Sequence, residues 1–148
     1  MSMALTTIGW REWVALPQLG IPKLKAKIDT GARTSCLHAF SIEEYDKDGD
    51  LWVRIGIHPI QRDNTTQYYC DAKVIDKRPV TDSGGHTEER YVISTLLELA
   101  GLQRMIEITL TNRDSMRFRM LLGRTSMLKT FMVDPSLSYV HADNQQSV

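Results

Sequence analysis

The sequence has few of the features that mark exported or membrane-bound proteins. Only two of its 148 residues are cysteines, Cys36 and Cys70, and residues 1–7 contain no charged stretch followed by a long apolar run. An export signal is therefore not predicted, and we expect reduced thiols and a cytoplasmic location. No apolar run reaches the roughly 18 residues that a membrane span requires, so we expect no association with a membrane.

A surplus of charge is also missing. Lysine and arginine together number 18, as do aspartate and glutamate, so the formal net charge is zero. This balance argues against general nucleic-acid binding, and we expect no nucleic-acid partner, although a local basic pocket remains compatible with it.

Two cofactor motifs are absent from the chain. It has no glycine-rich loop followed by Lys-Ser/Thr, which would cradle the phosphates of ATP, and no His-Glu-x-x-His zinc motif. The possible zinc ligands are scattered, and only the first two are close in sequence: Cys36, His38, His58, Cys70 and His86. We therefore predict neither a metal site nor a cofactor.

Short strands dominate the pattern that is present. Hydrophobic residues make up 42% and charged residues 24% of the chain, as in ordinary globular proteins. We predict one domain over residues 1–148, with flexible ends at 1–7 and 141–148. About nine short strands with regularly spaced turns favour a closed or partly closed all-β domain. One short helix is predicted near the C-terminus, over residues 125–131, and residues 95–100 could form either a strand or a helical turn.

The rest of the chain is organised around the stretch Asp29-Thr30-Gly31-Ala32. Lysines alternate with apolar residues over positions 23–28, which indicates a half-buried strand that ends at the acid. Gly31 is expected to permit a tight turn there. An acid held at a strand end beside a hydroxyl and backbone N–H groups outlines a chemical site. The alternative is a structural aspartate that caps the N–H groups of its own turn.

A second motif, Leu121-Leu122-Gly123-Arg124, lies late in the chain. Together the two motifs resemble the aspartic peptidases of the retropepsin class, in which the late segment packs behind the catalytic loop. A glycine-bearing hairpin at residues 83–86 has the position of the flap that covers the substrate. Over about residues 8–139 the chain is similar to the bacterial family labelled ATP-dependent zinc proteases (RimB-like). That family is regarded as retropepsin-like, and some members neighbour ATP-grasp ligases that add glutamates to a ribosomal protein.

The resemblance implies a pepsin-like barrel and a homodimer. Retropepsins need two carboxylates, so the second Asp29 would come from a partner copy. The implied catalytic residues are Asp29, Thr30 and Gly31, with the Thr30 hydroxyl bracing the paired loops. The implied substrate-binding residues are Ala32, Arg33, Gly84, Gly85, His86, Arg90 and Arg124. Glu88 or Glu89 could instead supply a second acid within one chain.

Arg33 distinguishes the site from that of the viral enzymes, which carry acidic residues just after the same motif. A cation there could bind an acidic substrate through its planar fork, with Arg78 and Arg90 adding to the rim. We therefore predict an aspartic peptidase acting on a peptide or protein substrate, with a preference for glutamate-rich tails. Two alternatives remain open at this point: a non-catalytic module that binds acidic peptides, and the metal-dependent hydrolase that the family label suggests.

Overall fold

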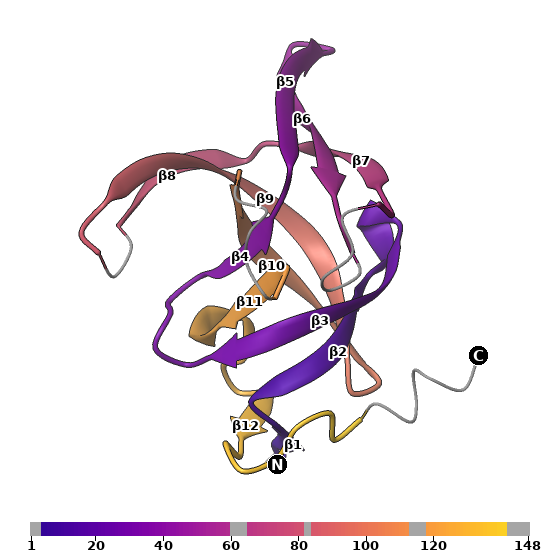
Figure 1. Cartoon of the computed structure of the whole chain (residues 1–148), viewed down its shortest axis with the longest axis vertical. Coiled ribbons are helices and arrows are strands. Elements are labelled where there is room, and N and C mark those ends of the chain that lie inside the picture. The colour runs from indigo at the N-terminus through magenta and orange to yellow at the C-terminus, as the bar shows by residue number, and fades with distance from the viewer. Residues whose placement is uncertain (1–3, 60–64, 82–83, 113–117, 142–148) are drawn as a thin grey trace.

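The computed structural model describes residues 4–59, 65–81, 84–112 and 118–141 (Figure 1). Nearly all of its regular structure is β-strand. The strands are β1 (Thr6–Ile8), β2 (Arg11–Leu16), β3 (Ile21–Asp29), β4 (Ser35–His38), β5 (Ser41–Lys47), β6 (Asp50–Ile57), β7 (Tyr68–Lys73), β8 (Asp76–Thr81), β9 (Thr87–Leu99), β10 (Leu102–Thr111), β11 (Met120–Gly123) and β12 (Phe131–Val133). Two 3-10 turns, η1 (Pro17–Leu19) and η2 (Arg124–Ser126), complete the elements.

The largest sheet closes on itself. Its order is β10-β4-β11-β3-β2-β9-β8, and β10 also pairs with β9, so six strands form a ring and β8 extends from its edge. Separate sheets are formed by β5-β6-β7 and by the parallel pair β1-β12, which lies at the bottom of Figure 1. The all-β, retropepsin-like barrel predicted from the sequence is confirmed.

The strand that leads to Asp29 has the predicted alternation. In β3 the side chains of Leu24, Ala26 and Ile28 are buried, and the lysines between them are not. β2 and β3 form the expected antiparallel hairpin. Because alternate side chains of a strand face opposite sides, one side of this hairpin enters the apolar core of the barrel and the other faces outward.

Other turns and strands also follow sequence signals. Asp48 and Gly49, with φ of 53° and 84°, connect β5 to β6, as a two-residue hairpin with left-handed central residues requires. Residues 95–99, for which a helical turn was an alternative, belong to strand β9.

Three local features differ from expectation. The helix predicted over residues 125–131 is shortened to the 3-10 turn η2, followed by further turns. Strands that are consecutive in the chain are usually neighbours, but β4 lies between β10 and β11 in the sheet. Thr6 and Thr7, predicted within a flexible end, lie in β1, whereas residues 1–3 and 142–148 are outside the described part of the chain. No helix among the described residues is long and apolar enough to cross a membrane.

Candidate active site

Asp29 ends β3, and its own loop fixes its carboxylate. The Gly31 N–H donates to Asp29 Oδ1 at 3.0 Å, and the Ala32 N–H donates to the same oxygen at 3.2 Å. The side chain is half-buried, and no hydrogen bond to Oδ2 is recorded from any described residue. The loop therefore orients the carboxylate through one oxygen, and the other accepts no hydrogen bond from the described residues.

Gly31 lies in the expected tight turn, in which the Ala32 N–H donates to the Asp29 carbonyl oxygen at 3.2 Å. Its φ lies outside the left-handed region, and a Cβ at this position would meet only Asp29 Oδ1, at 3.2 Å. The residue is thus required for the space beside the carboxylate rather than for the turn itself.

The late motif packs behind the Asp29 loop, as the resemblance implied. β11 lies parallel to β3 with Gly123 beside Asp29. A Cβ on Gly123 would lie 2.5 Å from the carbonyl carbon of Thr34 and 2.9 Å from the Ser35 nitrogen. Only glycine allows β11 to come this close to the chain that leaves the loop.

Hydrogen bonds tie the residues after Gly123 to the same loop. The Arg124 N–H donates to the Ala32 carbonyl oxygen at 2.8 Å, and Arg124 Nη1 donates to the Gly31 carbonyl oxygen at 3.2 Å. Thr125 donates to the Arg33 carbonyl oxygen through both its N–H (3.1 Å) and its hydroxyl (2.8 Å). Arg124, predicted to bind substrate, is therefore placed to brace the loop.

A buried pair of hydroxyls supports the loop from inside. Ser35 Oγ accepts a hydrogen bond from the Gly123 N–H at 3.0 Å and lies 2.7 Å from Ser126 Oγ. Both serines are buried, and Thr109 donates to the Ser35 carbonyl oxygen at 3.1 Å. The sequence itself does not point to this role for Ser35 or Ser126. Nothing in the chain marks a partnership across 91 residues.

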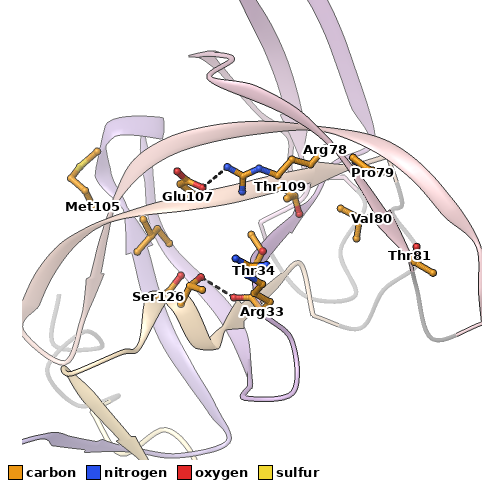
Figure 2. A pocket seen from close by; sticks show the side chains of 12 residues that line it. Arg33, Thr34, Arg78, Pro79, Val80, Thr81, Met105, Glu107, Thr109 and Ser126 are labelled. Atoms are coloured by element: carbon orange, nitrogen blue, oxygen red, sulfur yellow. Dashed lines mark hydrogen bonds and ion pairs between the residues drawn. The ribbon is translucent and has the colours of Figure 1, made fainter.

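A cavity of about 640 Å³ lies beside the loop, under strand β8. Figure 2 shows Arg78 and Glu107 on one wall and Arg33 with Thr34 on the opposite wall. The remaining lining comes from β8, β10 and η2: Pro79, Val80, Thr81, Met105, Ile106, Thr109, Thr125 and Ser126. Arg33, predicted to contact substrate, is thus exposed at the edge of a space large enough for several side chains.

The second arginine of the cavity is held by acids. Arg78 Nε donates to Asp76 Oδ2 at 2.8 Å, and Arg78 Nη2 donates to Glu107 Oε1 at 2.9 Å. The hydrogen bond from Arg78, followed by that from the Lys77 N–H, lowers the pKa of Asp76. The Arg78 charge is therefore neutralised locally, and Arg33 is the cation of the cavity better placed to meet an acidic ligand.

The hairpin of β8 and β9 has the position of the predicted flap. Gly84, Gly85 and His86 lie in its exposed turn, with Gly85 at a φ of 86°, and they are not among the residues that line the cavity. Residues 82 and 83 lie outside the described part of the chain. Glu88, at the start of β9, holds the Arg90 guanidinium at 2.6 Å, and Cys36 Sγ lies 3.5 Å from Arg90 Nη1. The structure thus brings Arg33 and Arg124 to the Asp29 loop. Arg90 instead contacts Glu88 and Cys36.

The candidate zinc ligands are not brought together. Among the residues that the structure describes, no group of three or more His, Cys, Asp or Glu side chains could hold a metal ion. These residues therefore do not fit the zinc site that the family label suggests.

Comparison with known proteins finds one family model that matches nearly the whole chain. The family model described as retropepsin-like aspartic endopeptidase RimB matches residues 7–144. A crystal structure of a Legionella pneumophila protein of unknown function superposes with a TM-score of 0.74 and 28% identity, covering 93% of this chain and 98% of that chain.

Curated relatives have a different name. The probable alpha-L-glutamate ligase of Shewanella pealeana is 47% identical over 132 residues, which are 89% of this chain and 29% of that protein. The probable alpha-L-glutamate ligase of Desulfotalea psychrophila is 46% identical over 135 residues, 91% of this chain and 29% of that protein. The chain therefore spans less than a third of the length of the curated relatives that it matches.

Proposed function

The chain belongs to the RimB-like family of retropepsin-like aspartic endopeptidases, and on that premise we propose that it hydrolyses peptide bonds with two Asp29 carboxylates from two copies of the chain. The observation that carries the proposal is the loop geometry. Asp29 Oδ1 is fixed by two backbone N–H groups, and Gly123 closes the loop from behind. Each chain supplies one such half-site, so a dimer completes the site.

The chemistry follows from two acids that share one proton. Two close carboxylates cannot both ionise easily, so one stays protonated. The ionised carboxylate takes a proton from a water molecule while the water oxygen attacks the scissile carbonyl carbon. The protonated carboxyl group gives its proton to the carbonyl oxygen. The tetrahedral intermediate collapses when the C–N bond breaks and the leaving nitrogen takes a proton. The carboxyl group that took the water proton donates it to the leaving nitrogen, and the other carboxylate regains a proton from a hydroxyl of the intermediate, so the pair again holds one proton.

Two observations support an acidic substrate. Arg33 stands at the edge of the cavity beside the Asp29 loop, whereas Arg78 is neutralised by Asp76 and Glu107. Relatives with a similar stretch are named probable alpha-L-glutamate ligases, which links the family to glutamate.

We therefore expect glutamate-rich tails to be cleaved in preference to neutral peptides. Arg33→Ala should reduce that preference, and unchanged relative rates on acidic and neutral peptides would contradict it.

Mixing active and inactive chains tests the shared site. Asp29→Asn removes the ionisable oxygen with little change in shape, so cleavage should be abolished. When wild-type chains are mixed with an excess of Asp29→Asn chains and allowed to exchange, activity should fall with the square of the wild-type fraction. A linear fall would show that each chain works alone and would contradict the shared site. Sedimentation analysis of both proteins checks that the substitution leaves the dimer intact.

The same variant separates the alternative function. A module that only binds acidic peptides would show no cleavage in the wild type, and its affinity would survive Asp29→Asn. The position of Arg33 at the cavity serves either function, so binding by itself does not distinguish them. Cleavage that is lost with Asp29 supports the peptidase.

A further inference from the structure

The outward side of β3 has a row of three lysines. Lys23, Lys25 and Lys27, here called the basic row, alternate with buried residues, and Asp29 is the next position of the same alternation. The three ammonium groups and the Asp29 side chain therefore project from the same side of β3. A strand rises about 3.3 Å per residue, so the row begins about 7 Å from Asp29 and extends to about 20 Å along the strand.

The neighbouring strand adds charge of the same sign. On β2, Arg11 lies opposite Lys27, and Trp13 lies opposite Lys25. Besides Asp29, the only acid in these two strands is Glu12, which is fully buried. No described carboxylate lies within ion-pair distance of Lys23 or Lys27. The outward side of these two strands therefore carries four basic side chains, and its one acid is Asp29.

The far end of the row opens into a second cavity, of about 260 Å³. Trp13, Pro22, Pro59 and Tyr68 contribute its apolar lining, and Lys23 and Lys25 contribute its charge. The Lys23 ammonium lies 4.3 Å from the centre of the Trp13 ring. An apolar wall beside an ammonium group suits a glutamate side chain, whose methylenes would pack on the apolar lining and whose carboxylate would face the lysine.

We propose that the basic row is an extended subsite for an acidic, glutamate-rich polypeptide that continues from the Asp29 site. The proposal takes its substrate class from the function proposed above. Alternate side chains of an extended peptide are about 6.6 Å apart, which matches the spacing of the lysines. Exposed ion pairs are individually weak, so the row recognises a run of acidic residues rather than one.

Binding of labelled oligoglutamates tests the row. Peptides of four and ten glutamates, each with a fluorescent label, are titrated by anisotropy with Asp29→Asn protein, so that cleavage does not consume the probe. In that background Lys23→Gln/Lys27→Gln should weaken binding of the longer peptide about three- to tenfold and affect the shorter one less. The affinity for the longer peptide should also depend less steeply on salt concentration. Lys47→Gln/Lys73→Gln removes the same charge from the separate β5-β6-β7 sheet and should change neither value.

The outcomes separate this proposal from the function on which it rests. Equal losses of affinity for the longer peptide in the two double variants would overturn the proposed role of the basic row. Asp29-dependent cleavage would be unaffected by that result. Tighter binding of a single-stranded oligonucleotide of equal charge than of the longer peptide would also overturn it, in favour of a nucleic-acid ligand. Loss of oligoglutamate binding in Lys23→Gln/Lys27→Gln, with no cleavage by the wild type, would support the row and overturn the peptidase.

Discussion

Gly31 lies in the Asp29 loop and Gly123 packs behind it, yet their substitution should affect stability and cleavage differently. A methyl group on Gly123 would meet the backbone of Thr34 and Ser35, which cannot rotate away. Gly123→Ala should therefore lower the free energy of unfolding by about 2 kcal/mol or more, as overpacking does. A methyl group on Gly31 would press only on Asp29 Oδ1. Gly31→Ala should leave stability nearly unchanged and reduce cleavage.

Urea unfolding and peptide cleavage, measured on both variants, check this contrast. The two glycines serve as controls for one another, because each change adds the same methyl group on one side of the loop. Equal losses of stability in both variants would contradict the separate roles assigned to them. So would a Gly123→Ala protein as stable as the wild type.

At the residue scale, the motif predicted the acid and the glycine behind it but not their supports. Asp29 and Gly123 are recognisable because each has a short local pattern around it. Ser126 forms its hydrogen bond with Ser35, 91 positions away, and isolated serines have no distinguishing pattern. Gly31 lies in the predicted turn, although its φ is outside the left-handed region that favours glycine.

At the scale of elements, Arg78 links strand β8 to strand β10 across the cavity. Its guanidinium contacts Glu107 on β10 and Asp76 at the start of β8. Arg78→Gln should therefore loosen the hairpin and raise amide exchange in residues 78–81 several-fold, with little change in global stability because such pairs are partly exposed. Hydrogen exchange followed by mass spectrometry measures this, and Arg54→Gln on β6 is the matched control.

Low pH should loosen the hairpin of β8 and β9 in the same way as Arg78→Gln. The pKa of Asp76 is lowered, first by its hydrogen bond from Arg78, so the contact is complete above the ordinary aspartate range. It is lost as the pH falls through the lowered value. Exchange in residues 78–81, corrected for its intrinsic rate, should stay constant between pH 8 and 5 in the wild type. A rise within that range would contradict the role of Asp76.

Strands with clear alternation were predictable as elements, whereas their partners were not. The lysine/apolar pattern of β3 and the Asp48-Gly49 turn each specify local structure. The predicted helix near the C-terminus is only a 3-10 turn, because the hydrogen bonds of Arg124 and Thr125 to the Asp29 loop outweigh the weak helical preference of so short a stretch. The insertion of β4 between β10 and β11 depends on pairing across the whole chain.

At the scale of the whole molecule, a separate two-stranded sheet joins the first strand to the last one. The pairing of β1 with β12 joins them, and a buried carboxylate holds the segment that follows. Glu12 Oε2 accepts hydrogen bonds from the Gly9 N–H at 2.7 Å and from the Val140 N–H at 3.0 Å, and Oε1 lies 3.4 Å from the His141 nitrogen. The sequence alone does not indicate that Glu12 accepts these hydrogen bonds, because the other inward-facing residues of its strand are apolar.

Substitution of Glu12 should show how much the joined ends contribute to stability. Glu12→Ala leaves the buried N–H groups of Gly9 and Val140 without their acceptor, so the free energy of unfolding should fall by about 2–4 kcal/mol. Glu12→Gln keeps one oxygen, which can occupy the position of Oε2 and retain the two shorter bonds, so its loss should be about 1 kcal/mol. Urea unfolding gives both values, and amide exchange at Gly9 and Val140 should rise in the same order. If the two variants lost equal stability, the charge of Glu12 rather than its acceptor geometry would hold the ends together.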